Sequence, residues 1–196
     1  MTKDKKILLT GFGPFRNHGE NPSEILVRKL STVFARQSNI HALILPTEYK
    51  RSWDMLEHAI TDYNPDIVLS FGLAARRKHI CLESTAFNSA STNLADASGY
   101  TPHKNDLITG APSFYKSNLP LARIEKTLRY QGHKVRVSRD AGDYVCNATL
   151  FKLLHHAKTE KPDMLATFVH IPKARPQGLF THESLQETAL AILDNV

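Results

Sequence analysis

Three residues at separate places in the chain have side chains suited to covalent hydrolysis: Cys146, His170 and Glu83. Cys146 follows a strand-like stretch and precedes a helical apolar pattern, which predicts a position in or near the first turn of a helix. The positive end of a helix stabilises a thiolate, and the thiolate is the nucleophile. The alternative is an inert buried thiol, because free cysteines are among the most buried residues.

His170 ends an apolar run just before Ile171 and Pro172. A histidine there could take a proton from a thiol and return it to a leaving amine, although a purely structural histidine is the alternative. Glu83 lies in an apolar stretch, where a carboxylate costs free energy unless it is paired. If its partner is His170, it orients the imidazole as the third member of a nucleophile, base and orienting set. Alternatively, it pairs with Arg77 or Lys78, or lies on an exposed edge.

The loop of residues 11–15 follows the first predicted strand but lacks the residues of a phosphate-binding loop. Arg16 stands where a dinucleotide fingerprint needs a small residue, and a Gly-Lys-Ser/Thr ending is absent. The loop carries two aromatic side chains, Phe12 and Phe15. They either line a pocket or pack under the sheet.

The elements that must position these residues alternate between strand and helix. We expect strands near residues 6–10, 40–45, 66–72, 79–88, 134–138 and 164–171, and helices near 21–34, 53–60, 121–129, 144–156 and 183–193. This alternation predicts an α/β fold with a largely parallel sheet and helices on both faces. Ligands of such sheets bind at the carboxyl ends of strands, which places the expected site at residues 11–15, 72–83, 141–146 and 170–172.

Residues 89–118 form the least regular stretch, and a region of that length is usually functional, an interface or mobile. The 196 residues show no repeat or linker, so we expect one domain over residues 1–196. No run approaches the length of a membrane helix and no signal-peptide core is evident, which favours the cytosol.

Composition narrows the classes of function. Lysine and arginine number 25 against 19 acidic residues, a net charge of +6, but the only dense basic run is residues 75–79, so nucleic-acid binding is disfavoured. Two cysteines exclude a disulfide framework and an all-cysteine zinc site. The scattered histidines form no metal constellation, and we expect no cofactor.

Taken together, these segments resemble pyroglutamyl peptidase type I, also called pyrrolidone-carboxylate peptidase, over most of the chain. Residues 9–15 with Asn21-Pro-Ser23 look like that family's opening loop and first helix. Leu82-Glu83 with Asn88, residues 141–147, and Val169-His-Ile-Pro172 resemble its glutamate, cysteine and histidine motifs.

The resemblance implies a metal-independent, cytoplasmic cysteine peptidase that removes an N-terminal pyroglutamyl residue from a peptide through a thioester on the nucleophile. It implies a three-layer α/β/α sandwich with a mostly parallel central sheet, commonly assembled as a homotetramer. Its catalytic residues would be Cys146 as nucleophile, His170 as general base and acid, and Glu83 as the orienting group. The substrate-binding residues carried over from the family are Phe12, Phe15, Asn21, Leu73, Arg77 and Val145.

Four features depart from the family pattern. Leu73 replaces a glutamine that the family uses near the substrate ring, and Ala75 and Arg76 replace two glycines. Asp143 replaces a threonine; it either opposes thiolate formation or caps the helix with its side chain. The part after Pro172 is shorter than usual. These changes leave open a hydrolase of the same fold with another small amide substrate, or a non-catalytic protein that binds an acidic partner through residues 76–78.

Overall fold

The computed structural model describes residues 5–15 and 19–196. Its main sheet has six strands in the order β2-β1-β3-β8-β4-β7. Their bounds are β1 Ile7–Phe12, β2 Ile40–Leu45, β3 Ile67–Leu73, β4 Ile80–Glu83, β7 Val135–Ser138 and β8 Leu165–Ile171. All neighbouring pairs are parallel except β4 and β8. The predicted α/β class with a mostly parallel sheet is confirmed.

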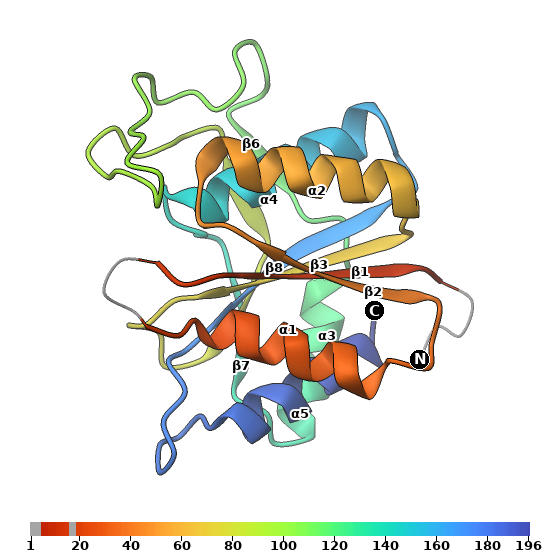
Figure 1. Cartoon of the computed structure of the whole chain (residues 1–196). Coiled ribbons are helices and arrows are strands. Elements are labelled where there is room, and N and C mark those ends of the chain that lie inside the picture. The colour runs from red at the N-terminus through yellow and green to blue at the C-terminus, as the bar shows by residue number, and fades with distance from the viewer. Residues whose placement is uncertain (1–4, 16–18) are drawn as a thin grey trace.

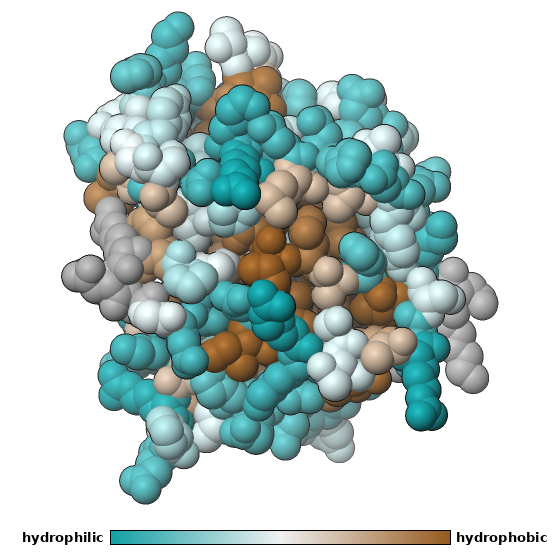
Figure 2. All heavy atoms as spheres, in the orientation of Figure 1, coloured by the Kyte–Doolittle hydropathy of each residue, from teal (hydrophilic) through white to brown (hydrophobic). Residues whose placement is uncertain are grey.

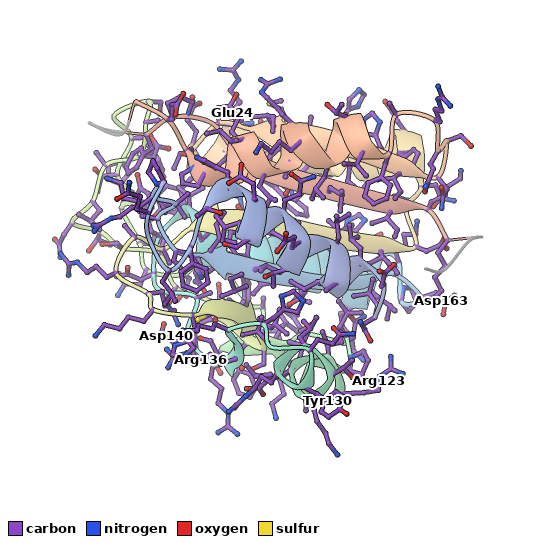
Figure 3. All side chains as sticks on the ribbon, turned by 90° about the horizontal axis from the view of Figure 1, so that it is seen from below. Glu24, Arg123, Tyr130, Arg136, Asp140 and Asp163 are labelled. Carbon is purple, nitrogen blue, oxygen red and sulfur yellow. The ribbon has the colours of Figure 1, made fainter. Side chains whose placement is uncertain are left out.

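The helices cover both faces of the sheet (Figure 1). On one face lie α2, Tyr49–Tyr63, and α4, Val145–Thr159; on the other lie α1, Pro22–Val33, α3, Leu121–Tyr130, and α5, His182–Leu193. Figure 3, seen from below, shows α1, α5 and α3 side by side across the second face. Each layer buries its own apolar cluster against the sheet, and Phe168 belongs to the cluster under α2 and α4. None of the helices in the described residues is long and apolar enough to cross a membrane.

Local signals explain where helix α1 begins. The side chain of Asn21 accepts a hydrogen bond from the backbone N–H of Ser23, and Pro22 occupies the first turn. Gly11 lets this helix approach β1, because a Cβ atom there would lie 2.5 Å from the carbonyl oxygen of Ser23. The end of β1 is therefore held against the start of the helix.

One expectation about the fourth strand is wrong. The predicted strand 79–88 is divided into β4 and β5, Thr85–Phe87, and β5 pairs with β6, Phe114–Lys116, in a separate sheet. In addition, β4 runs antiparallel to β8, because the short connection 74–79 after β3 is not long enough for the crossover that a parallel strand needs. Consequently, the carboxyl end of β4 does not lie at the edge of the sheet where the carboxyl ends of β1, β2, β3 and β8 meet.

The outermost strand at the other edge, β2, has only one fully buried residue, Leu45. In Figure 2, apolar side chains gather in the middle of the face where this edge lies between α1 and α2.

Candidate active site

Cys146 is the second residue of α4, as the sequence pattern predicts, and its side chain is half-buried. The helix begins after Tyr144, and no side chain caps it. The capping role considered for Asp143 is therefore wrong: this residue is exposed, and its carbonyl accepts a hydrogen bond from the N–H of Ser91 at 2.6 Å. Backbone N–H groups in the first turn of α4 remain free of a capping side chain.

The thiol lies against the ends of two neighbouring strands, β3 and β8. In the register, Gly72 pairs with His170. A Cβ atom on Gly72 would lie 2.6 Å from Cζ of Phe168 and 3.2 Å from Sγ of Cys146. Only glycine leaves room at this position for both side chains. Sequence reasoning placed residue 72 at a strand end but did not assign it a role in the site.

His170 and Glu83 form a buried pair. Nδ1 of His170 lies 2.8 Å from Oε1 of Glu83, and the residues are 5% and 0% exposed. In the register, Glu83 stands opposite Phe168, so it reaches His170 diagonally across the antiparallel strands. Burial lowers the pKa of His170, but hydrogen bonding to Cys146 and Glu83, together with their charges, raises it to about 9 overall. The imidazole is thus placed between the thiol and the carboxylate.

Arg77 contacts the same carboxylate oxygen as His170. Its Nη2 lies 3.3 Å from Oε1 of Glu83, its Nη1 donates to Oγ of Ser138 at 3.1 Å, and Nη2 also donates to the carbonyl of Asp140. Glu83 therefore has both partners that the sequence offered as alternatives, His170 and Arg77. Its second oxygen, Oε2, is buried and has no hydrogen bond to any residue in the described ranges 5–15 and 19–196. Arg77 links the orienting carboxylate to the turn that leads to α4.

The thiol opens on a cavity of about 180 Å³. Its lining residues come from the ends of β1, β2 and β3 and from the start of α4: Phe12, Phe15, Asn21, Thr47, Gly72, Leu73, Ala75, Tyr144 and Cys146. The structure thus brings four predicted substrate-binding residues, Phe12, Phe15, Asn21 and Leu73, to the nucleophile. The other two predicted substrate-binding residues do not line the cavity. Arg77 contacts the carboxylate of Glu83, and the fully buried side chain of Val145 packs in the core.

The walls of this cavity are aromatic or aliphatic, with few polar side chains. Asn21 uses its side chain to cap α1 and to donate to the carbonyl of Gly13 at 3.0 Å. Thr47 is 7% exposed, and its buried Oγ1 has no hydrogen-bond partner in the part of the chain that the structure describes. Sequence reasoning missed Thr47, although the rule that ligands bind at carboxyl ends of parallel strands could have found it, since it follows β2.

The turn after β3 contains Ala75 and Arg76, which stand where the family pattern has two glycines. Ala75 and Arg76 belong to a turn in which the N–H of Arg77 donates to the carbonyl of Ala74 at 2.9 Å. Neither residue has a positive φ, so the turn does not require glycine at these positions. The replacement of two glycines leaves the turn intact.

Two side-chain amides, those of Asn88 and Asn147, anchor the irregular segment 89–113 to the rest of the fold. The side chain of Asn147 donates to the carbonyls of Phe87 and Ser89, both at 2.8 Å, and accepts from the N–H of Phe87. Asn88 accepts from the N–H groups of Leu107 and Ile108. The sequence signal for this role was Asn147 within the largely apolar start of α4, because a buried amide needs hydrogen-bond partners.

Comparisons with known proteins agree with this geometry. Residues 5–190 match the family model described as pyroglutamyl peptidase. The chain is similar to the pyrrolidone-carboxylate peptidase of Thermococcus litoralis, with 34% identity over 168 residues that cover 86% of this chain and 76% of the relative. The corresponding peptidase of Oceanobacillus iheyensis is 34% identical over 175 residues, which cover 89% of this chain and 87% of the relative.

Solved structures are similar as well. The crystal structure of pyroglutamyl peptidase I from Bacillus amyloliquefaciens has a TM-score of 0.90 at 29% identity, covering 98% of this chain and 96% of that one. Pyrrolidone carboxyl peptidase from Fervidobacterium islandicum has a TM-score of 0.91 at 29% identity, covering 98% of each chain. With the family match over residues 5–190, these similarities show that the chain belongs to the pyroglutamyl peptidase family.

Proposed function

We propose that Cys146, His170 and Glu83 carry out the reaction of this cysteine peptidase family, the removal of an N-terminal pyroglutamyl residue from a peptide. The observation that carries the proposal is the buried His170–Glu83 pair, 2.8 Å apart, beside a thiol that opens on a small cavity. The arrangement has the three roles of a nucleophile, a base and a group that orients the base.

The reaction begins when the Cys146 thiolate attacks the carbonyl carbon of the pyroglutamyl residue. Free N–H groups in the first turn of α4 can stabilise the oxyanion that forms. His170 then donates its proton to the leaving amine, the C–N bond breaks, and a thioester remains on Cys146. A water molecule that loses its proton to His170 hydrolyses the thioester and releases pyroglutamate.

The cavity suits an uncharged ring. Phe12, Phe15 and Leu73 supply apolar walls, and the volume of about 180 Å³ restricts the pocket to a small group. The lactam has a polar edge that must find hydrogen bonds when it is buried. We assign one of these bonds to Thr47, whose Oγ1 has no hydrogen-bond partner among the residues that the structure describes. In this chain the glutamine of the family pattern is absent, so Thr47 takes on more of the recognition.

The experiment that tests this function is hydrolysis of a fluorogenic pyroglutamyl amide by the reduced protein. We expect Cys146→Ser to lower kcat/KM by at least about 10³-fold, because the nucleophile is lost. Cys81→Ala is the control for the other cysteine: Cys81 is buried in β4 opposite His170 and does not line the cavity, so activity should fall far less than in Cys146→Ser.

Two other outcomes would point elsewhere. Cleavage of another small cyclic amide, dependent on Cys146 but without cleavage of the pyroglutamyl amide, would favour a hydrolase with altered specificity. No cleavage of any amide, with equally slow alkylation of Cys81 and Cys146, would favour a non-catalytic binding protein.

We further propose a homotetramer in the cytoplasm, which rests on the family resemblance. Light scattering on the purified protein checks the assembly, and a monomer at micromolar concentration would contradict it.

A further inference from the structure

A second and larger cavity, of about 740 Å³, lies beside the small one. It is formed by the start of α2, by Lys152 of α4 and by the irregular segment from Asp96 to Leu107. Figure 1 shows this segment over the starts of both helices. The volume is in the range of sites that bind drug-sized ligands, yet the reaction described above does not use this cavity.

The two cavities share an aromatic wall. Tyr144 lines the small cavity and Tyr49 the large one, and their rings meet edge to face with centroids 5.6 Å apart. Tyr100 continues the row at 6.4 Å from Tyr49. Because an extended peptide advances by roughly 3.5 Å per residue, a chain whose first residue fills the small cavity reaches the large one with its next two or three residues.

Most charged groups around the large cavity already have partners. Lys50 pairs with Asp54 and Arg51 with Glu48. The carboxylate of Asp96 accepts hydrogen bonds from the backbone N–H groups of three residues, Tyr49, Ser98 and Tyr100. A ligand would have to compete with these partners, and the two other charged residues that line the cavity, Lys104 and Asp106, are exposed to solvent.

Lys152 differs from them. It is half-buried on α4, and in the part of the chain that the structure describes no carboxylate lies within 4 Å of its ammonium group. Burial lowers its pKa, while the more distant Asp54 and Glu57 partly oppose that effect. The ammonium group also lies over the ring of Trp53, 6.0 Å from its centroid, a contact that leaves its charge without a counter-ion. A partly buried ammonium group without an ion pair gains free energy when an anion binds to it.

We propose that the large cavity binds the residues that follow the pyroglutamyl group, and that Lys152 binds the C-terminal carboxylate of a short peptide there. Tyr49 and Tyr100 would contact an apolar or aromatic side chain of that peptide. The proposal rests on the proposed function and adds a substrate class to it: pyroglutamyl tripeptides with a free carboxylate and an apolar last residue.

The test compares three substrates: pyroglutamyl-alanyl-phenylalanine, the same peptide with an amidated C-terminus, and the fluorogenic pyroglutamyl amide. For the wild-type protein we expect kcat/KM to be about tenfold higher for the free acid than for the amidated peptide. Lys152→Gln should abolish this preference and leave hydrolysis of the fluorogenic amide within about twofold. Lys158→Gln, an exposed lysine on the same helix, should retain the preference.

A second variant guards against a folding defect in Lys152→Gln. Tyr100 is 47% exposed on the irregular segment, so Tyr100→Ala should fold normally. It should reduce kcat/KM for the phenylalanine peptide about fivefold relative to the fluorogenic amide.

The possible results separate the two proposals. Equal rates for acid and amide in the wild type, or equal losses in Lys152→Gln and Lys158→Gln, would overturn the large-cavity proposal while fluorogenic hydrolysis still supports the function. Failure of the wild type on all three substrates would overturn the function, and the large-cavity proposal with it.

Discussion

The Glu83→Gln substitution tests the link between the carboxylate and the catalytic base. It keeps the size of the side chain but removes the negative charge that lies 2.8 Å from Nδ1 of His170. It also places an amide N–H₂ where Oε2 is now buried without a partner, and an unsatisfied buried donor costs free energy. The substitution therefore weakens the charged form of His170 without opening a cavity.

The size of the effect follows from the pKa of His170, which is about 9 against an ordinary value of 6.5. That shift corresponds to about 3 kcal/mol in favour of the protonated imidazole, shared between Cys146 and Glu83. A hydrogen bond to a charged group contributes ~1.5–3 kcal/mol, so we expect kcat/KM to fall between about 10- and 150-fold.

The pH dependence gives a second readout. The thiolate–imidazolium pair exists while His170 is protonated, so wild-type activity should fall as pH rises through about 9. In Glu83→Gln the pKa of His170 drops, and the alkaline limb should move to lower pH by about one unit or more. The raised pKa also contributes stability that is full below pH 6.5 and is lost as pH rises through 9, a loss that should shrink in the variant.

The assay is kcat/KM for the fluorogenic amide from about pH 6 to about pH 10, beside the rate of Cys146 alkylation by iodoacetamide over the same range. Both profiles should shift together. An alkaline limb that stays in place in Glu83→Gln would refute the assignment of Glu83 as the group that stabilises the imidazolium.

Three further substitutions test the surroundings of the site. Gly72→Ala puts a Cβ atom 2.6 Å from Phe168, so urea unfolding should show a loss of ~1–3 kcal/mol and kcat/KM should fall by about 10²-fold through displacement of the nucleophile; an active and equally stable variant would contradict this packing. Thr47→Val removes an unpartnered buried hydroxyl, so the free energy of unfolding should stay equal or rise while kcat/KM falls about tenfold; unchanged activity would exclude a substrate bond. Arg77→Gln should lower kcat while KM changes little, and it should reduce the free energy of unfolding by about 1–2 kcal/mol, because Glu83 loses an ion-pair partner. A change in KM alone would instead support a substrate-binding role for Arg77.

The irregular segment shows how far sequence reasoning reaches. Its length and lack of pattern indicated a special role, but the side chains that hold it lie outside it: Asn88 directly precedes it, and Asn147 belongs to α4. Their partners are up to 60 residues away, beyond any local rule. Local sequence therefore predicted which segment lacks regular secondary structure, but it did not predict which side chains hold that segment in place.

The sequence by itself determined the alternation of strands and helices, the start of α1 and the position of Cys146 at the start of α4. These features depend on apolar periodicity and on capping within a few residues. It also carried the motifs that identify the family.

Only the tertiary structure decided the diagonal contact of Glu83 with His170 and which residues at the strand ends line one cavity with the thiol. Each depends on which strands become neighbours and in what register, and these are set by packing of the whole sheet rather than by residues nearby in the chain. The short connection after β3 was a signal for the reversal of β4, because a parallel partner needs a longer crossover. The chemistry of the site was thus encoded in residue types, while its geometry arose from long-range pairing.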